Sequence, residues 1–300
     1  EEARKESLKI LDIYKTVVND ILAIPVLTGT KTDSEKFAGA VDTYTIEMMM
    51  DDKKALQAGT SHYLGQNFAK AFDVKFQDTD NKEKYVYATS WGVTTRLIGA
   101  LIMVHGDDKG LRLPPNIAPI QIVVVPIFKN DEDLKVIQST LQNLMNNLNE
   151  NNITYYFDNR KKISPGFKFN EWEMKGVPIR LEVGLRDIDA KQITCVRRDT
   201  LEKSFIKINE AYKQLTTMIL EIQNNMFNRA TEYLNSNITV VNSYDDFKAV
   251  ILTGGFVKCG WDGNNKTEKL IKNETNATIR CIPFDSKVDK KQKCIYSRKP

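Results

Sequence analysis

Histidine and cysteine are scarce in this sequence of 300 residues, which contains only two histidines and four cysteines. No stretch approaches the roughly 18–20 apolar residues of a membrane span, and the longest apolar run, residues 120–128, is interrupted by Gln121 and Pro126. There is no signal peptide and no starting methionine. These absences predict a cytoplasmic protein with no membrane partner. The sequence also starts and stops without terminal signals, and we expect it to be a portion of a longer protein.

Neither sign of charge is in large excess, since 43 basic residues face 39 acidic ones and the net charge is +4. A nucleic-acid partner is therefore permitted but not required. The hydrophobic content of 41% is enough to bury a core in each of two or three domains.

The four cysteines are Cys195, Cys259, Cys281 and Cys294, and three of them lie in the last fifth of the chain. They could form two disulfides in a secreted protein, or they could belong to a metal site or its remnant. Asn-x-Thr triplets occur, but they are expected by chance in a chain so rich in asparagine. We therefore expect reduced thiols in the cytoplasm.

Apolar residues at helical spacing between Leu8 and Leu22 predict an opening helix that ends before Pro25. The run Tyr44–Met50 favours a strand. Glycines then recur through a region of mixed strand and helix. Pro114-Pro115 indicates a break between domains.

A strand–helix–strand pattern begins after this break. The run Ile122–Val125 predicts a buried strand, apolar residues from Leu134 to Leu148 predict a helix, and Ile153–Phe157 predicts a second strand, which together form a parallel βαβ unit. Further strands are expected at Ile179–Val183 and Ile193–Val196, and a long helix from about Ile208 to Leu234.

A small domain is predicted to close the chain. Ser243 and Asp246 form a capping box for a helix that Gly254-Gly255 ends. Two short strands are expected near Val257 and Ile279. The core candidates of this domain are Phe247, Val250, Ile251, Ile279 and Ile282.

Two stretches combine small residues with hydrogen-bonding side chains, which lets a backbone approach a ligand closely. One contains Gln57, Gly59-Thr60 and His62, and the other runs from Ser90 to Arg96. Arg96 opens an apolar helix, where a guanidinium could hold a phosphate or lie over a base. Taken alone, Thr94-Thr95-Arg96 is also typical of a helix cap with a solvated charge. A single histidine is more often structural than functional, and this holds more strongly for His105 than for His62.

Long motifs in this sequence resemble those of the prolyl-tRNA synthetase family, class II aminoacyl-tRNA synthetases, in its eukaryotic and archaeal type. The resemblance covers essentially the whole chain and places it in the C-terminal portion of such a protein. The motifs that carry it are Lys36-Phe37-Ala38-Gly39, Gly59-Thr60-Ser61-His62, Ser90-Trp91-Gly92-Val93-Thr94-Thr95-Arg96, His105-Gly106-Asp107-Asp108, Ser164-Pro165-Gly166-Phe167-Lys168 and Trp172-Glu173-Met174-Lys175-Gly176.

This resemblance implies an α/β and α+β multidomain fold. Residues 1–118 would be the C-terminal half of an antiparallel-sheet catalytic domain, residues 119–225 an α/β anticodon-binding domain with a mixed sheet, and residues 226–300 a small α/β C-terminal domain. The catalytic domain would also form a homodimer. The first two class-defining motifs and the main proline-binding loop would precede Glu1.

The resemblance also implies roles for particular residues. Arg96 would be catalytic and would bind ATP, which enters with Mg²⁺, together with Gln57, Thr60 and Thr94. Proline would be bound by His62, with Phe37, Ser90, Trp91 and Gly92 walling its pocket. In the second domain Asp158, Arg160, Lys168 and Glu171 would contact the anticodon of tRNA(Pro) from an aromatic-rich loop region, although each taken singly could be a solvated surface charge.

The implied reaction is activation of L-proline by ATP, followed by transfer of the prolyl group to the 3′ end of tRNA(Pro). Positioning and charge stabilisation suffice for both steps, so no Ser–His–Asp or Cys–His constellation is needed. The main alternative is a non-catalytic tRNA-binding or regulatory protein derived from such an enzyme. A weaker alternative is a synthetase for threonine or histidine.

Relatives in this branch often carry a C-terminal zinc site of four cysteines. Here Cys259 matches the first of those ligands, but no cysteine follows it closely as the second. Cys294 matches the third ligand, and Tyr296 stands where the fourth would be. A structural zinc needs four ligands. We therefore expect no metal in this domain, although Cys281 could be recruited as a ligand.

Overall fold

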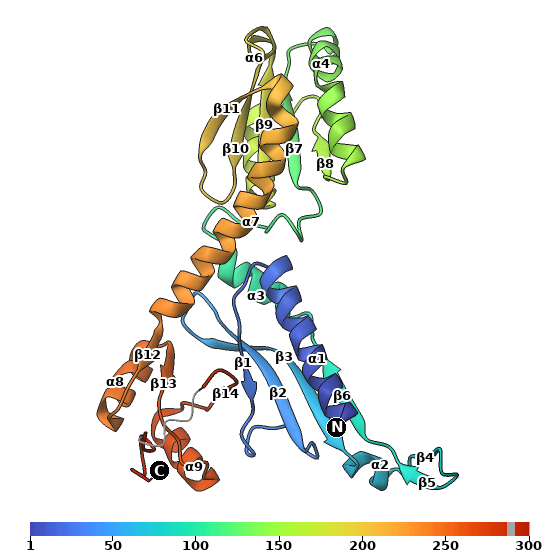
Figure 1. Cartoon of the computed structure of the whole chain (residues 1–300). Helices are drawn as coiled ribbons and strands as arrows, with labels where there is room; N and C mark the ends of the chain where they lie inside the picture. Colours follow the sequence, from blue (N-terminus) through green and yellow to red (C-terminus); the bar gives the residue numbers. More distant parts are fainter. Residues whose placement is uncertain (287–291, 300) are drawn as a thin grey trace. The chain divides into compact units, whose positions relative to one another are not determined.

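The computed structural model describes residues 1–286 and 292–299, which form two units (Figure 1). One comprises Glu1–Asn19, Ile24–Ala100 and Thr231–Pro300, and the other Asp20–Ala23 and Leu101–Ala230. Helices α3 (Arg96–His105) and α7 (Ala211–Ser236) contribute residues to both units. None of the helices in the described residues is long and apolar enough to cross a membrane. The predicted domain boundaries stay a prediction.

The first unit is built on a five-stranded antiparallel sheet with the strand order β14-β1-β2-β3-β6, in which the edge strand β14 is Ile282–Pro283. The opening helix α1 packs against β3 and β6 and continues into a π-helical turn, Val17–Ile21, before Pro25 (Figure 1). The predicted opening helix and the strand near Tyr44 are therefore confirmed. The elements are α1 (Glu2–Thr16), β1 (Leu27–Thr30), β2 (Asp42–Met49), β3 (Ala55–Gly65), α2 (Asn67–Ala71), β4 (Lys75–Gln77), β5 (Glu83–Tyr85) and β6 (Ala88–Gly92).

The second unit contains the predicted βαβ unit within a mixed sheet of order β11-β10-β9-β7-β8. Strand β7 is parallel to β8 and β9, whereas β10 is antiparallel to β9 and β11. The elements are β7 (Ile122–Ile127), α4 (Asp131–Glu150), β8 (Tyr155–Phe157), α5 (Pro165–Met174), β9 (Ile179–Gly184), α6 (Leu185–Asp189), β10 (Gln192–Arg197), β11 (Lys203–Lys207) and the 3₁₀ turn Ile208–Glu210.

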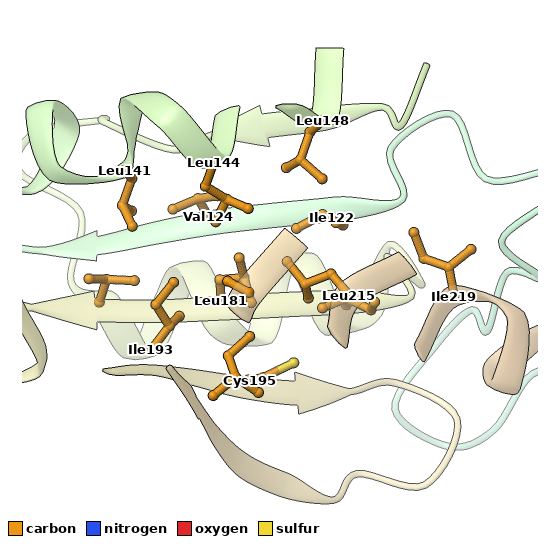
Figure 2. Packing of buried hydrophobic residues seen from close by; sticks show 14 of the residues in the cluster. Ile122, Val124, Leu141, Leu144, Leu148, Leu181, Ile193, Cys195, Leu215 and Ile219 are labelled. Carbon is orange, nitrogen blue, oxygen red and sulfur yellow. The ribbon is translucent and has the colours of Figure 1, made fainter. Parts of the chain in front are cut away.

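Strand β7 is buried on both faces, which explains its continuous apolar run. On one face Ile122 and Val124 pack with Leu141 and Leu144 of α4 and with Leu215 of α7 (Figure 2). On the other face Val123 and Val125 pack with Trp172 of α5.

The C-terminal elements are β12 (Ile238–Val240), α8 (Tyr244–Thr253), β13 (Phe256–Lys258), α9 (Asn265–Thr275) and β14 (Ile282–Pro283). The Ser243 hydroxyl accepts a hydrogen bond from Asp246 N, and Gly254 ends α8 with a φ of 81°, as predicted.

One expectation for this part of the chain is corrected. The strand expected near Ile279 lies at Ile282–Pro283, and it pairs with β1 in the first sheet. Because residues of this segment leave to join the first sheet, Ile279 and Ile282 do not belong to the small core. Ile271 and Ile295 take their place beside Phe247.

Candidate functional site

One face of the first sheet is lined by small and polar residues that stand opposite one another on neighbouring strands. Thr60 of β3 pairs with Thr45 of β2 and with Gly92 of β6, and His62 pairs with Thr43 and Ser90. Directly opposite residues of antiparallel strands point to the same side. The fold therefore brings four predicted site residues (Thr60, His62, Ser90, Gly92) onto one face.

Helix α1 covers the opposite face. The Ser61 hydroxyl donates a hydrogen bond to Ser7 O of α1 at 2.7 Å, and Ser61 alternates with Thr60 and His62 along β3. The Trp91 side chain points to the α1 side, because Trp91 pairs with Ser61. The structure thus separates the Trp91 ring from Ser90 and Gly92, and any role of Trp91 in a pocket stays a prediction.

His62 lies in a small group with Phe37 and Thr43. Its ring centroid is 4.8 Å from that of Phe37, and its Nδ1 shares a hydrogen bond of 2.9 Å with the Thr43 hydroxyl, whose direction depends on the imidazole tautomer. Phe37 N donates to the same hydroxyl at 3.0 Å. Burial lowers the pKa of His62. A neutral imidazole beside an exposed aromatic ring suits a small ligand that carries a cation.

Arg96 and Gln57 also meet, although they are 39 positions apart. The Arg96 guanidinium donates to Gln57 O at 3.3 Å, and the Thr94 hydroxyl accepts from Arg96 N at 3.3 Å. The cap that the sequence suggested is therefore present. In residues 1–286 and 292–299 Arg96 forms no ion pair, so its charge is available to an anionic ligand.

His105 has a structural position, which is the role that the sequence favoured for it. It is buried and its Nε2 lies 2.9 Å from Leu22 O. Burial lowers the pKa of His105 to about 4, so the ring is neutral near pH 7.

The residues that would hold a metal ion do not gather in the described part of the chain, where no three His, Cys, Asp or Glu side chains form a suitable group. In the C-terminal part, Cys259 packs against the core formed by Val241, Phe247, Ile271 and Ile295, and burial raises the pKa of its thiol to about 11. The expectation that zinc is absent stays a prediction.

The four predicted anticodon residues meet in the second unit. The Asp158 carboxylate accepts from Arg160 Nε at 2.8 Å and from Trp172 Nε1 at 2.8 Å, and Arg160 also donates to Glu171 at 2.7 Å. Lys168 Nζ donates to Asp158 O at 2.8 Å. Burial acts to raise the pKa of Asp158, but the hydrogen bonds from Arg160 and Trp172 outweigh it and hold the pKa well below its usual range.

One expectation for this group is wrong. Lys168 and Glu171 lie on helix α5 rather than in a loop, because the Ser164 hydroxyl caps the helix and Pro165 occupies its first turn. The alternative of a solvated surface charge is wrong for Asp158 and Lys168, since their side chains are 0% and 2% exposed. Arg160, at 33%, retains the most exposure and is the member best placed to meet a ligand.

Sequence reasoning missed Thr43, Thr45 and Glu47, which share the polar face with His62 and Thr60. A signal was present in the alternation of these polar residues with Tyr44, Ile46 and Met48. The run was interpreted only as a strand, without a functional face.

Three protein-family models match successive parts of the chain. "tRNA synthetase class II core domain (G, H, P, S and T)" matches residues 1–105, "Anticodon binding domain" matches 121–218, and "Prolyl-tRNA synthetase, C-terminal" matches 244–300. The chain belongs to the prolyl-tRNA synthetase family. The expected fold class, a class II core followed by anticodon-binding and C-terminal domains, is confirmed.

Alignments with members of the prolyl-tRNA synthetase family cover the whole chain. It is 52% identical over 303 residues to "Proline--tRNA ligase" of Bacteroides fragilis and 51% identical over 302 residues to that of Phocaeicola vulgatus, and each alignment covers 100% of this chain and 61% of the relative. For the protein of the same name from Flavobacterium johnsoniae the identity is 48% over 301 residues, again with 100% and 61% covered. The chain thus spans about three-fifths of the length of these synthetases. The eukaryotic and archaeal type stays a prediction, as do the roles of individual residues.

Proposed function

We propose that the protein containing this chain is a proline–tRNA ligase. A carboxylate oxygen of L-proline attacks the α-phosphate of ATP, pyrophosphate leaves, and the prolyl group moves from the adenylate to the 3′-terminal ribose of tRNA(Pro). The observation that carries the proposal is the shared face of β2 and β3 in a class II core, where His62, Thr43 and Phe37 form one group and Thr60 lies beside them. The proposal includes a cytoplasmic homodimer.

In this proposal the described residues bind and orient the substrates. Arg96, Thr94, Gln57 and Thr60 hold ATP, with the guanidinium stabilising charge on the phosphates. The neutral His62 and the Phe37 ring hold proline, with the backbone of Ser90–Gly92 at the edge of the pocket. Mg²⁺ bound with ATP supplies further charge neutralisation.

Pyrophosphate exchange by the full-length protein, measured with each amino acid in turn, tests the proposal. Exchange that depends on proline supports it. Dependence on threonine or histidine would assign another substrate, and tRNA binding without any exchange would favour the non-catalytic alternative.

Acidification is expected to weaken proline binding through His62. Burial lowers the pKa of His62, so the ring stays neutral near pH 7 and gains its proton only on the acid side of its ordinary range. The added cation would repel the ammonium group of proline. We expect the KM for proline to rise about threefold or more between about pH 7.5 and about pH 5.5, and to rise much less in His62→Gln. An equal rise in both proteins would contradict a role for this imidazole.

Arg160→Ala is expected to separate the two reactions. Because Arg160 belongs to the second unit, its loss should lower kcat/KM for tRNA charging about tenfold while changing pyrophosphate exchange less than about twofold. Lys161→Ala is the matched control, since Lys161 is an exposed neighbour paired only with Asp131 at the surface. Equal loss of both activities would indicate a structural role for Arg160.

A further inference from the structure

A fully buried carboxylate lies on the polar face of the first sheet. The Glu47 side chain is 0% exposed, and its Oε1 accepts from Lys31 Nζ at 2.7 Å and from the Thr45 hydroxyl at 2.7 Å. Its Oε2 accepts from Arg280 Nε at 2.9 Å and from Arg280 NH2 at 2.7 Å. A buried charge is tolerated only with such a complete set of partners.

Arg280 reaches this carboxylate from the C-terminal part of the chain, 233 positions away. Its own backbone carbonyl accepts from Lys31 Nζ at 2.7 Å, so Lys31 holds both Glu47 and the segment that carries Arg280. The Glu47 carboxylate is therefore held by two cations, Lys31 just after β1 and Arg280 just before β14.

Gly29 fixes the side of the sheet on which this segment lies. A Cβ added to Gly29 would stand 2.3 Å from Ile282 O and 2.9 Å from Cys281 Cβ, so only glycine leaves room for the segment. Gly29 pairs with Thr45, and Thr45 pairs with Thr60. The backbone at residues 281–282 therefore lies close to Gly29, at the edge of the sheet and on the side that carries Thr45 and Thr60.

A second contact joins the C-terminal part to the loop before Phe37. The carboxylate of Glu268, on α9, accepts from the Thr32 hydroxyl at 2.9 Å and from the Ser34 hydroxyl at 2.7 Å. Glu268 is also buried. Two buried carboxylates, Glu47 of β2 and Glu268 of α9, thus join the C-terminal part to β2 and to the loop that follows β1.

We propose that Arg280 is a positioning residue for the ATP-binding part of this site. It holds Glu47, Glu47 fixes the Thr45 hydroxyl, and Thr45 sets the position of Thr60 beside it. The inference rests on the proposed function, in which Thr60 contacts ATP. Arg280 itself touches no substrate, and its effect passes through the carboxylate.

Steady-state kinetics of pyrophosphate exchange by the full-length protein test this role. Removal of the guanidinium in Arg280→Ala should raise the KM for ATP about tenfold, as small displacements of binding groups do, and the KM for proline less than about threefold, because His62 lies farther along β3 from the Thr45–Thr60 pair. Arg280→Lys retains a charged donor and should restore the KM for ATP to within about threefold of the parent. Arg298→Ala removes a guanidinium of the same C-terminal part, which among the described residues donates to Asn242 O, and should leave both constants unchanged.

The outcomes separate the two claims. A parent protein without proline-dependent exchange overturns the proposed function and this inference with it. An active parent with an unchanged KM for ATP in Arg280→Ala overturns the inference alone. If the variant instead loses kcat while both KM values stay constant, the mutation has only reduced the folded fraction, and the positioning role is wrong. Arg280→Lys decides the matter if Arg280→Ala does not fold.

Discussion

Arg96→Ala is expected to lower proline-dependent pyrophosphate exchange at least about tenfold in the full-length protein, a loss of at least about 1.4 kcal/mol of transition-state stabilisation. The guanidinium stands at the start of α3 and forms no ion pair among the described residues, so its charge is free for the phosphates of ATP. In the folded chain its main contact is one hydrogen bond of 3.3 Å to Gln57 O.

Because the Arg96 side chain is exposed and makes one weak contact, its removal should change the thermal unfolding midpoint by no more than about 2 °C. Arg96→Lys keeps the charge but loses the planar fork, and should fall between the parent and the alanine variant. Arg186→Ala, which removes an exposed arginine of α6, is the control for net charge. Exchange within twofold of the parent in Arg96→Ala would sink the assignment of this residue to ATP.

The βαβ unit and the long helix α7 could be predicted because their information is local. Ile122 to Val125 form a continuous apolar run, which is what a strand buried on both faces requires, and α4 follows with a clear apolar stripe. The helix cap at Ser243 was equally local, since its hydroxyl accepts from Asp246 N three residues further on.

The group around Asp158 shows where local reasoning ended. A pattern of charged and aromatic residues was interpreted as an anticodon-binding loop, but Lys168 and Glu171 lie on a helix and pairing lets Asp158 and Lys168 be buried. Burial of a charge depends on the partners that the fold places beside it. For Asp158 one such partner is Trp172, which is 14 positions away in the sequence. The helix itself could have been found, because Ser164 and Pro165 are strong start signals.

The link between Glu47 and Arg280 could not have been predicted from one sequence. Neither residue belongs to a motif, and 233 positions separate them. The pairing of β14 with β1 could not be predicted for the same reason, because β1 lies near the opposite end of the chain.

Lys168→Ala is expected to destabilise the second unit by about 3 kcal/mol, because the buried Asp158 carbonyl loses its charged hydrogen-bond donor and the packing of the lysine side chain is lost. Lys168 Nζ donates to Asp158 O at 2.8 Å and lies 3.5 Å from Asp158 Oδ1, and both side chains are almost fully buried. The aliphatic part of the lysine is lost as well, so Lys168→Met, which keeps most of that volume, should cost less than the alanine variant.

Denaturant unfolding followed by tryptophan fluorescence, in a background with Trp91→Phe and Trp261→Phe, reports on this group, because the Trp172 indole donates to Asp158 at 2.8 Å. Lys161→Ala is the matched control: it removes a lysine of the same unit whose ion pair with Asp131 is exposed, and should change the free energy of unfolding by no more than about 0.5 kcal/mol. If Lys168→Ala kept the stability of the parent yet lost tRNA charging, Lys168 would have to reach the RNA itself, and the buried position described here would not be the one that functions. If Lys168→Ala instead lost tRNA charging only to the extent that it lost folded protein, Lys168 would be structural. Arg160 would then be the member of the group that contacts the anticodon.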